Sequence, residues 1–167
     1  CEAAAKDASA IRASGAAPMP LLRAAFACMQ SVCASYLHML NDADLVRCIN
    51  ALPSFSMQTE DVAMALQANG TLWDLTESIE RRDREQAVEL WLVLLQRLRD
   101  VAQVPQANMA ECALANLFQV LLQYHLSFRA EDWIRVLSDV LLPLIEGEHA
   151  PARAFHGTAR VVAMVPA

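Results

Sequence analysis

The residues best suited to chemistry in this sequence are two cysteines and a histidine that could bind a metal ion. Cys28, Cys33 and His38 follow one another at intervals of five residues, and zinc binds thiolate and imidazole groups. At about 100° per residue, however, steps of five scatter these side chains around a helix. We therefore expect no metal site and no cofactor. The sequence has 5 cysteines without the spacing of a disulfide framework, which indicates small buried side chains in a reducing compartment.

Carboxylate pairs that could serve acid–base catalysis occur at Glu60-Asp61 and Glu131-Asp132. Both pairs stand at the beginning of a predicted helix, where acidic side chains cap free N–H groups and suit the helix dipole. His125 ends a predicted helix, where a positive side chain is equally favourable. The sequence has no glycine-rich phosphate loop, no HExxH and no GxSxG motif. We therefore predict that the chain is not an enzyme.

The composition indicates a helical and acidic protein. Of its 167 residues, 56% are hydrophobic and only 4 are glycine, which favours an all-helical domain. A net charge of −6 argues against nucleic acid as a partner, because phosphate binding needs a basic surface. No apolar run approaches the roughly 20 residues of a membrane-spanning helix, and residues 1–17 lack the apolar segment of a secretory signal. Because the chain begins with Cys1, we expect it to be a piece of a longer protein.

Six helices are predicted from hydrophobic periodicity and from start and stop signals. Residues 1–17 are rich in alanine and are interpreted as a linker or the end of a preceding helix, and residues 148–167 as an irregular tail. Pro53 and Pro105 follow predicted helix ends, because the residue before a proline avoids the helical conformation. The predicted helices cover about 20–40, 42–51, 59–82, 84–103, 106–125 and 130–146.

Taken in pairs, the predicted helices begin new hairpins near residues 18, 59 and 106, at spacings of 41 and 47 residues. HEAT and armadillo repeats have periods of about 40–47 residues. The helix over 59–82 also has an apolar arc of about 200°, twice that of a simple surface helix, so it must contact neighbours on two sides. We therefore predict an all-α fold, a HEAT/armadillo-like right-handed α-solenoid of three helical hairpins over residues 18–147. A plain helical bundle is the alternative.

Two residues inside that helix, Asn69 and Gly70, form a dipeptide typical of turns. On a helical wheel Asn69 lies within the apolar arc, where a buried amide needs a hydrogen bond to backbone groups of an adjacent helix or loop. Gly70 lies at the border of the arc, where its cost in helix stability would be offset by close approach of another backbone or a large side chain. We interpret the pair as a helix-packing contact, with a real break in the helix as the alternative.

The three tryptophans, Trp73, Trp91 and Trp133, each lie within an apolar arc, which favours core packing. Tryptophan is also a frequent anchor of protein interfaces. One that proves exposed in a groove between helices would be the best candidate for a partner site. The mixed-charge run over 80–85 is interpreted as a solvated turn, with a partner contact as the alternative.

Four motifs in register resemble a family of large trafficking proteins. They are ANGTLWDL (68–75), ELWLVLLQRLRDV (89–101), ANLFQVLLQYHLSF (115–128) and EDWIRVLSDVLLPLIE (131–146). Their order resembles a region of the large Arf guanine-nucleotide exchange factors of the BIG type, and even more the monensin-sensitivity-two family. In those proteins this region, called homology downstream of Sec-seven, is built of armadillo-type repeats. The residues that we predict to have structural packing roles are Asn69, Gly70, Trp73, Trp91, Phe118 and Trp133.

One departure from the family concerns the loop between the second and third hairpins. The family usually has a D-x-R-x-x-V-R pattern there, in which Asp and Arg connect adjacent repeats. This chain has DVAQVPQANMAEC over 100–112, so that Asp100 and Pro105 are present and the arginines are missing. The departure indicates a divergent member and places the usual ladder between repeats in doubt.

The resemblance implies a non-catalytic scaffold segment of a protein that acts in vesicle-mediated transport. It implies a cytoplasmic location, peripheral on Golgi, trans-Golgi or endosome membranes through the full-length protein. The implied partners are Dopey-type proteins and Arf or Arf-like GTPases. Exchange activity in the BIG type belongs to a separate catalytic domain, so no active site is implied here. The alternatives are the regulatory region of a large exchange factor, a HEAT-type adaptor of an unrelated pathway, and an accessory domain of an enzyme.

Overall fold

The computed structural model describes residues 19–147 and 152–163, and these residues form helices and turns. Residues of high helix propensity, chiefly alanine and leucine, dominate the sequence, and the described part is all-α as predicted. Its elements are α2 (Met19–Ser35), η1 (Leu37–Met39), α3 (Asp42–Ser56), α4 (Val62–Glu80), α5 (Arg84–Ala102), α6 (Ala107–Gln123), η2 (His125–Ser127), α7 (Ala130–Val136), η3 (Leu137–Leu141, a π-helical turn), α8 (Leu142–Glu146) and α9 (Ala152–Val162).

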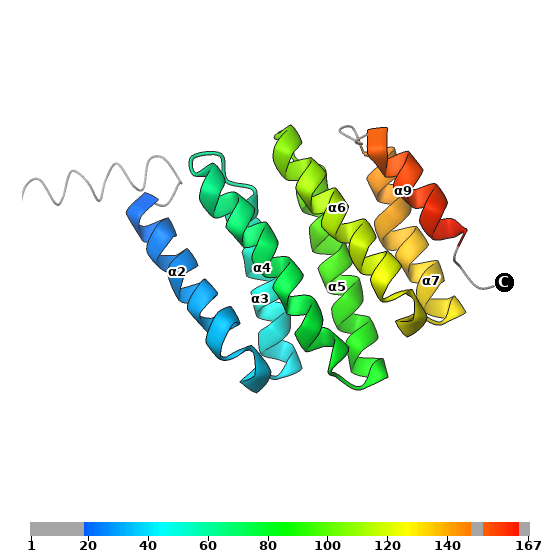
Figure 1. Cartoon of the computed structure of the whole chain (residues 1–167), viewed down its shortest axis with the longest axis horizontal. Coiled ribbons are helices and arrows are strands. Elements are labelled where there is room, and N and C mark those ends of the chain that lie inside the picture. Colours follow the sequence, from blue (N-terminus) through cyan, green and yellow to red (C-terminus); the bar gives the residue numbers. More distant parts are fainter. Residues whose placement is uncertain (1–18, 148–151, 164–167) are drawn as a thin grey trace, which may run out of the picture.

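The helices are arranged in two layers of a row of hairpins (Figure 1). One layer contains α2, α4, α6 and α9, and the other contains α3, α5 and the run from α7 to α8. Helix α4 packs against α2 and α6 in its own layer and against α3 and α5 in the other, as its wide apolar arc predicts. The core lies between the layers and includes Leu45, Leu72 and Leu94, all fully buried. The described part is therefore a helical-repeat segment, with α2 and α9 at opposite ends of the row.

The first and third hairpins repeat the same local design. Helices α2 and α6 each have 17 residues and begin 88 residues apart (19 against 107), and α3 and α7 begin at the same offset (42 against 130). The turn that follows the first helix has nearly the same backbone in both, with φ −121° and ψ 5° at Tyr36 and φ −108° and ψ 18° at Tyr124. The repeat is thus visible in turn geometry and in helix length.

Helix α3 differs from the sequence prediction, because it continues to Ser56 instead of ending before Pro53. A proline inside a helix removes one backbone hydrogen bond and costs about 3 kcal/mol. The last turn offsets this cost by burial, since Pro53 is itself buried and Phe55 packs on Phe26 of α2 with ring centroids 5.2 Å apart. Tertiary contact therefore decides where this helix ends.

The tail also differs from the prediction, because residues 152–162 form helix α9 and not an irregular segment. Helix α9 begins 45 residues after α6 (152 against 107), within the repeat period, and takes the layer position of the first helix of a further hairpin. Val161 is buried. A Cβ atom at Gly157 would lie 2.2 Å from the Phe118 ring of α6, so glycine allows α9 to approach α6 closely. Residues 1–17 and the rest of the predicted tail lie outside the described residues.

Helix α4 runs without interruption through Asn69 and Gly70, so the prediction of a continuous helix is confirmed and the alternative of a break is wrong. Asn69 is fully buried. The close approach expected at Gly70 is also wrong, because Gly70 is exposed and a Cβ atom there would meet nothing within 4 Å. The physical reason is that Gly70 lies on the outer face of its layer; the close helix approach occurs at Gly157 instead.

Replacing Gly70 with alanine is expected to raise the free energy of unfolding by about 0.5–1 kcal/mol, because alanine loses less backbone entropy in an open helix position. Urea denaturation followed by circular dichroism measures the change. Gly157→Ala provides the contrast and is expected to destabilise, since its Cβ atom would displace the Phe118 ring. A loss of stability in Gly70→Ala would show that some neighbour does approach this position.

Candidate interaction surface

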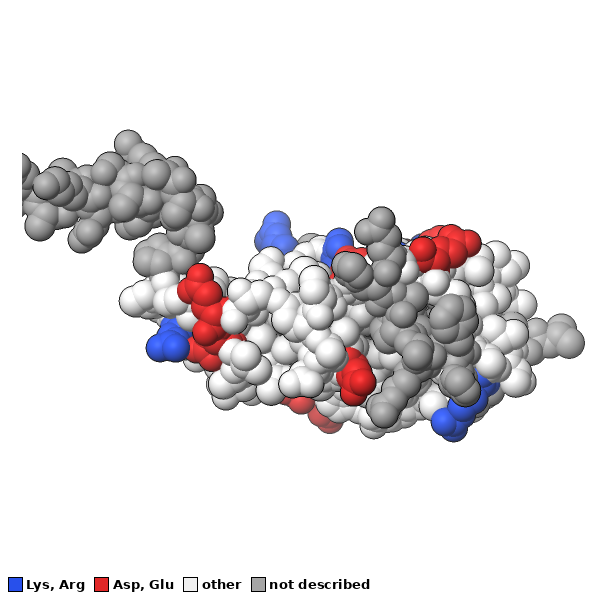
Figure 2. Space-filling view, turned by 90° about the horizontal axis from the view of Figure 1, so that it is seen from above, with Lys and Arg blue, Asp and Glu red and all other residues white. Residues whose placement is uncertain are grey.

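The charged side chains are scattered over the face of the molecule that Figure 2 shows, and basic residues do not gather there. Most of the described surface in this view is uncharged. Nucleic-acid phosphates are bound by clustered lysine and arginine. Within the described residues, this face shows no cluster of that kind.

The acidic pairs and His125 have structural positions. The Asp61 carboxylate accepts a 3.0 Å bond from the Met64 N–H and so caps α4, which begins at Val62 and not at the predicted residue 59. This bond, with Arg23 adding to it, holds the pKa of Asp61 below its ordinary value. Asp132 accepts a 2.8 Å bond from a backbone N–H at the beginning of α7. His125 Nδ1 lies 2.9 Å from a backbone carbonyl one turn earlier.

The two cysteines and the histidine that were considered as metal ligands differ in their exposure to solvent. Cys28 and His38 are exposed and Cys33 is buried. Burial raises the pKa of the Cys33 thiol to about 12, and the neighbouring Cys48 thiol and the Asp74 carboxylate add to the effect. Across the described ranges, no three His, Cys, Asp or Glu side chains lie together so that they could hold a metal ion.

None of the described helices is long and apolar enough to span a bilayer.

Asn69 connects α4 to α6. Its Nδ2 donates to the Cys112 sulfur at 3.1 Å, and its backbone carbonyl accepts a 3.2 Å bond from Asn116 Nδ2. The Asn69 Oδ1 atom is buried and has no hydrogen-bond partner among the described residues. The sequence predicted a bond from this amide to backbone groups, whereas the structure pairs it with a thiol.

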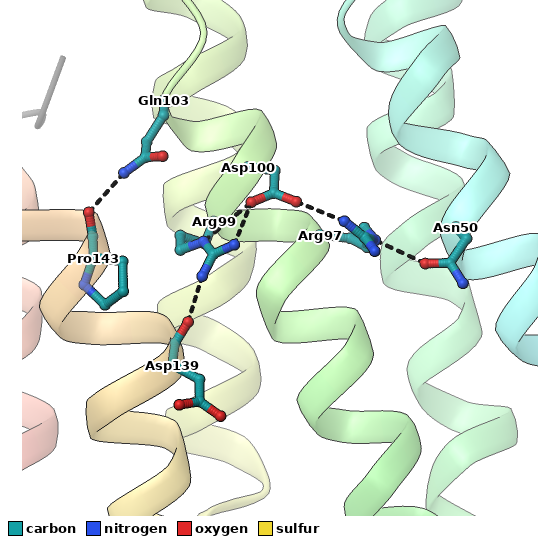
Figure 3. Close-up of polar contacts among 7 residues, drawn as sticks. All are labelled: Asn50, Arg97, Arg99, Asp100, Gln103, Asp139 and Pro143. Atoms are coloured by element: carbon teal, nitrogen blue, oxygen red, sulfur yellow. Dashed lines mark hydrogen bonds and ion pairs between the residues drawn. The ribbon is translucent and has the colours of Figure 1, made fainter. Parts of the chain in front are cut away.

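A series of polar contacts, here called the polar ladder, connects α3, α5 and η3, which belong to three successive hairpins (Figure 3). Arg97 of α5 donates to Asn50 of α3 at 2.7 Å and to the Asp100 carboxylate at 2.8 Å. Arg99 donates to the other Asp100 oxygen at 2.6 and 3.1 Å and also to the backbone carbonyl of Asp139 in η3. One carboxylate thus holds two arginines that contact the hairpins on either side.

A ladder between repeats is thus present, although the loop arginines of the family pattern are missing. The arginines that connect the repeats precede Asp100 in α5 instead of following it, and sequence reasoning missed them because it compared only the loop. Pro143 has no N–H for the carbonyl of Asp139 four residues earlier, which leaves that oxygen for Arg99. Gln103 adds a 2.8 Å bond to the Pro143 carbonyl.

Replacing Asp100 with alanine is expected to lower the free energy of unfolding by about 1–3 kcal/mol, because two guanidinium groups lose a charged hydrogen-bond partner. The Asp100 side chain is 26% exposed, so solvent relieves part of the loss. Asp139→Ala is the matched control, since the ladder uses only its backbone carbonyl. Urea denaturation should show Asp139→Ala within about 0.5 kcal/mol of wild type; equal losses in both variants would contradict the ladder.

The hydrogen bonds between hairpins repeat the period seen in the sequence. The side-chain bonds between hairpins join residues that lie 38 to 47 positions apart. Examples are the bonds of Arg23 with Asp61, of Asn69 with Cys112 and of Arg97 with Asn50. One such pair is Arg135 of α7 with Glu89 of α5, and this bond lowers the pKa of the Glu89 carboxyl. Adjacent repeats are therefore connected by contacts of similar sequence separation.

A groove of about 780 Å³ lies between the C-terminal half of α2 with η1 and that of α4. Among its lining residues are Cys33, His38, Trp73, Asp74, Glu77 and Arg81. Trp73 is partly exposed, whereas Trp91 is 0% and Trp133 1% exposed. Those two pack in the core against Tyr124 and Phe128, with ring centroids 4.5 and 5.4 Å apart. Trp73 is therefore partly buried against the core, as its predicted packing role requires, and is also the one of the three tryptophans that reaches this groove.

Together, the layered hairpins and the repeat-spaced hydrogen bonds define a helical-repeat protein. The chain is similar to Protein MON2 homolog of Drosophila melanogaster, with 22% identity over 153 residues that cover 78% of this chain and 9% of the relative. It is also similar to Protein MON2 homolog of Schizosaccharomyces pombe (strain 972 / ATCC 24843), with 21% identity over 152 residues, 77% of this chain and 9% of the relative.

These similarities confirm the resemblance to the monensin-sensitivity-two family. The chain spans only 9% of the length of each of these relatives. No family model and no solved structure matches it.

Proposed function

We propose that this chain is a non-catalytic helical-repeat scaffold segment of a vesicle-trafficking protein of Golgi and endosome membranes, and that it contributes protein–protein contacts. The similarity to the two MON2 homologs supports the proposal. The fold supports it as well, because stacked helical repeats offer extended surfaces to partners. The observation that carries the proposal is the partly exposed Trp73 in the groove between α2 and α4.

The composition of the groove supports the proposal. An aromatic side chain surrounded by polar and charged ones is the usual arrangement of an interface hot spot and its rim. We propose a Dopey-type protein or an Arf or Arf-like GTPase as the partner, with the full-length protein holding the segment on the cytoplasmic side of the membrane.

The test measures the binding of the purified 167-residue chain to a purified Dopey-type protein and to an Arf GTPase loaded with GDP or a GTP analogue. Biolayer interferometry gives the affinities. Trp73→Glu is expected to weaken the productive interaction by roughly thirtyfold or more, as the loss of a hot-spot residue does. Ile134→Glu is the matched control, because Ile134 is another exposed apolar side chain, 66% accessible, on α7 outside the groove.

Three outcomes would contradict the proposal. The first is a partner affinity that Trp73→Glu leaves unchanged, and the second is no binding to any of these partners. The third is faster nucleotide exchange on the GTPase in the presence of the chain, which would contradict its non-catalytic character.

A further inference from the structure

The groove between α2 and α4 contains one acidic side chain that lacks a counter-ion. Arg81 pairs with Glu77 one turn before it, and Arg82 donates to Asp42 at 2.8 Å. Asp74 is exposed and, within the part of the chain that the structure describes, makes neither a hydrogen bond nor an ion pair. The lining thus has two carboxylates and two arginines, and Asp74 is the charged side chain among them that is left for a partner.

Asp74 and Trp73 face the same space. Both line the groove, and Asp74 acts electrostatically on the Cys33 thiol of α2 across it. Trp73 is the preceding residue and is partly exposed. An indole face attracts cations, most strongly when the cation is partly desolvated, and a neighbouring carboxylate adds a direct ion pair.

We propose that this groove binds a protein segment that presents an arginine or a lysine to Trp73 and Asp74. The proposal rests on the function proposed above and names the chemistry of the partner. The guanidinium or ammonium group stacks on the indole and pairs with the carboxylate, and the apolar stem of the side chain packs against Ala34 and Leu37 on the opposite wall.

An acidic segment suits the groove poorly. The two arginines that line it, Arg81 and Arg82, already have carboxylate partners, so they have less positive charge to offer. The chain as a whole has a net charge of −6 and so repels acidic segments and attracts basic ones.

The experiment selects random phage-displayed peptides on the purified 167-residue chain and measures the affinity of the enriched peptides by fluorescence polarisation. We expect the enriched peptides to share an arginine or lysine next to an apolar residue. Asp74→Asn should weaken their binding about 2- to 5-fold, and Trp73→Leu about 3- to 30-fold, with Trp73→Phe between wild type and Trp73→Leu. Raising the ionic strength should weaken binding to the wild type more than to Asp74→Asn.

Glu85→Gln is the matched control, because Glu85 is an exposed carboxylate on α5 away from the groove, and this variant should bind as the wild type does. Circular dichroism checks that each variant is folded.

Enriched peptides that depend on Trp73 but lack a basic residue, or that bind Asp74→Asn as well as wild type, overturn this inference and leave the proposed function standing. If no peptide binds in a Trp73-dependent way, the groove fails as a binding site and both proposals lose their support. Self-association of the wild type that Asp74→Lys abolishes, seen by analytical ultracentrifugation, would assign the groove to a second copy of the chain and overturn the inference.

Discussion

Replacing Trp91 with alanine is expected to lower the free energy of unfolding by about 3–5 kcal/mol, the usual cost of truncating a fully buried tryptophan. Trp91 is 0% exposed in α5 and packs against Tyr124, which follows α6. Because α5 lies in the middle hairpin, a cavity there loosens the contact between the second and third hairpins. Urea denaturation monitored by circular dichroism gives the free energy of unfolding. The slope of this free energy against urea concentration reports whether the surface exposed on unfolding is unchanged.

Trp73→Ala separates folding from binding. This side chain is partly exposed, so its truncation is expected to cost only about 1–2 kcal/mol while the partner affinity falls. Trp91→Phe, which keeps an aromatic ring against Tyr124, should recover most of the stability lost in Trp91→Ala. If Trp91→Ala and Trp73→Ala were equally stable, the assignment of one tryptophan to the core and the other to the groove would be wrong.

Replacing Asn69 with aspartate is expected to lower the free energy of unfolding by about 3–5 kcal/mol at neutral pH, because a charge would be buried without a partner. Asn69 is 0% exposed, and its Oδ1 atom has no hydrogen-bond partner among the described residues. Asn69→Leu removes the unpaired oxygen along with the 3.1 Å bond to the Cys112 sulfur. Leucine should therefore leave the stability within about 1 kcal/mol of wild type.

The pH dependence distinguishes a buried charge from a simple misfit. Burial would raise the folded-state pKa of an aspartate at position 69 above its unfolded value of about 3.9. With a raised pKa, the folded protein keeps the protonated, tolerated form at pH values where the unfolded chain is already ionised. Stability is therefore fully present below the unfolded pKa and is lost as the pH rises through the folded pKa. The stability difference between Asn69→Asp and Asn69→Leu should thus shrink as the pH falls from about 7 to about 4. A difference that does not change with pH would contradict the burial of this side chain.

Several features of the fold could be predicted from short stretches of sequence. The all-α class, the hairpin period and the continuous course of α4 follow from apolar spacing and capping residues, because these act within a helix or its ends. The same local signals failed at Pro53 and in the tail. In α3 the Phe26–Phe55 contact outweighs a proline, and in α9 the contact of Gly157 with Phe118 depends on a helix far away in the sequence.

By itself, the sequence determined the helices between residues 19 and 146 except for the end of α3, their pairing into repeats and the resemblance to the monensin-sensitivity-two family. Only the tertiary structure decided that Trp73 reaches a groove while Trp91 and Trp133 are buried, and that Arg97 and Arg99 share Asp100. The physical reason is that a helical wheel gives the direction of a side chain from its own axis, whereas exposure and hydrogen bonding depend on the distance to the next helix. That distance is set by packing between hairpins, which brings together residues some 40 positions apart.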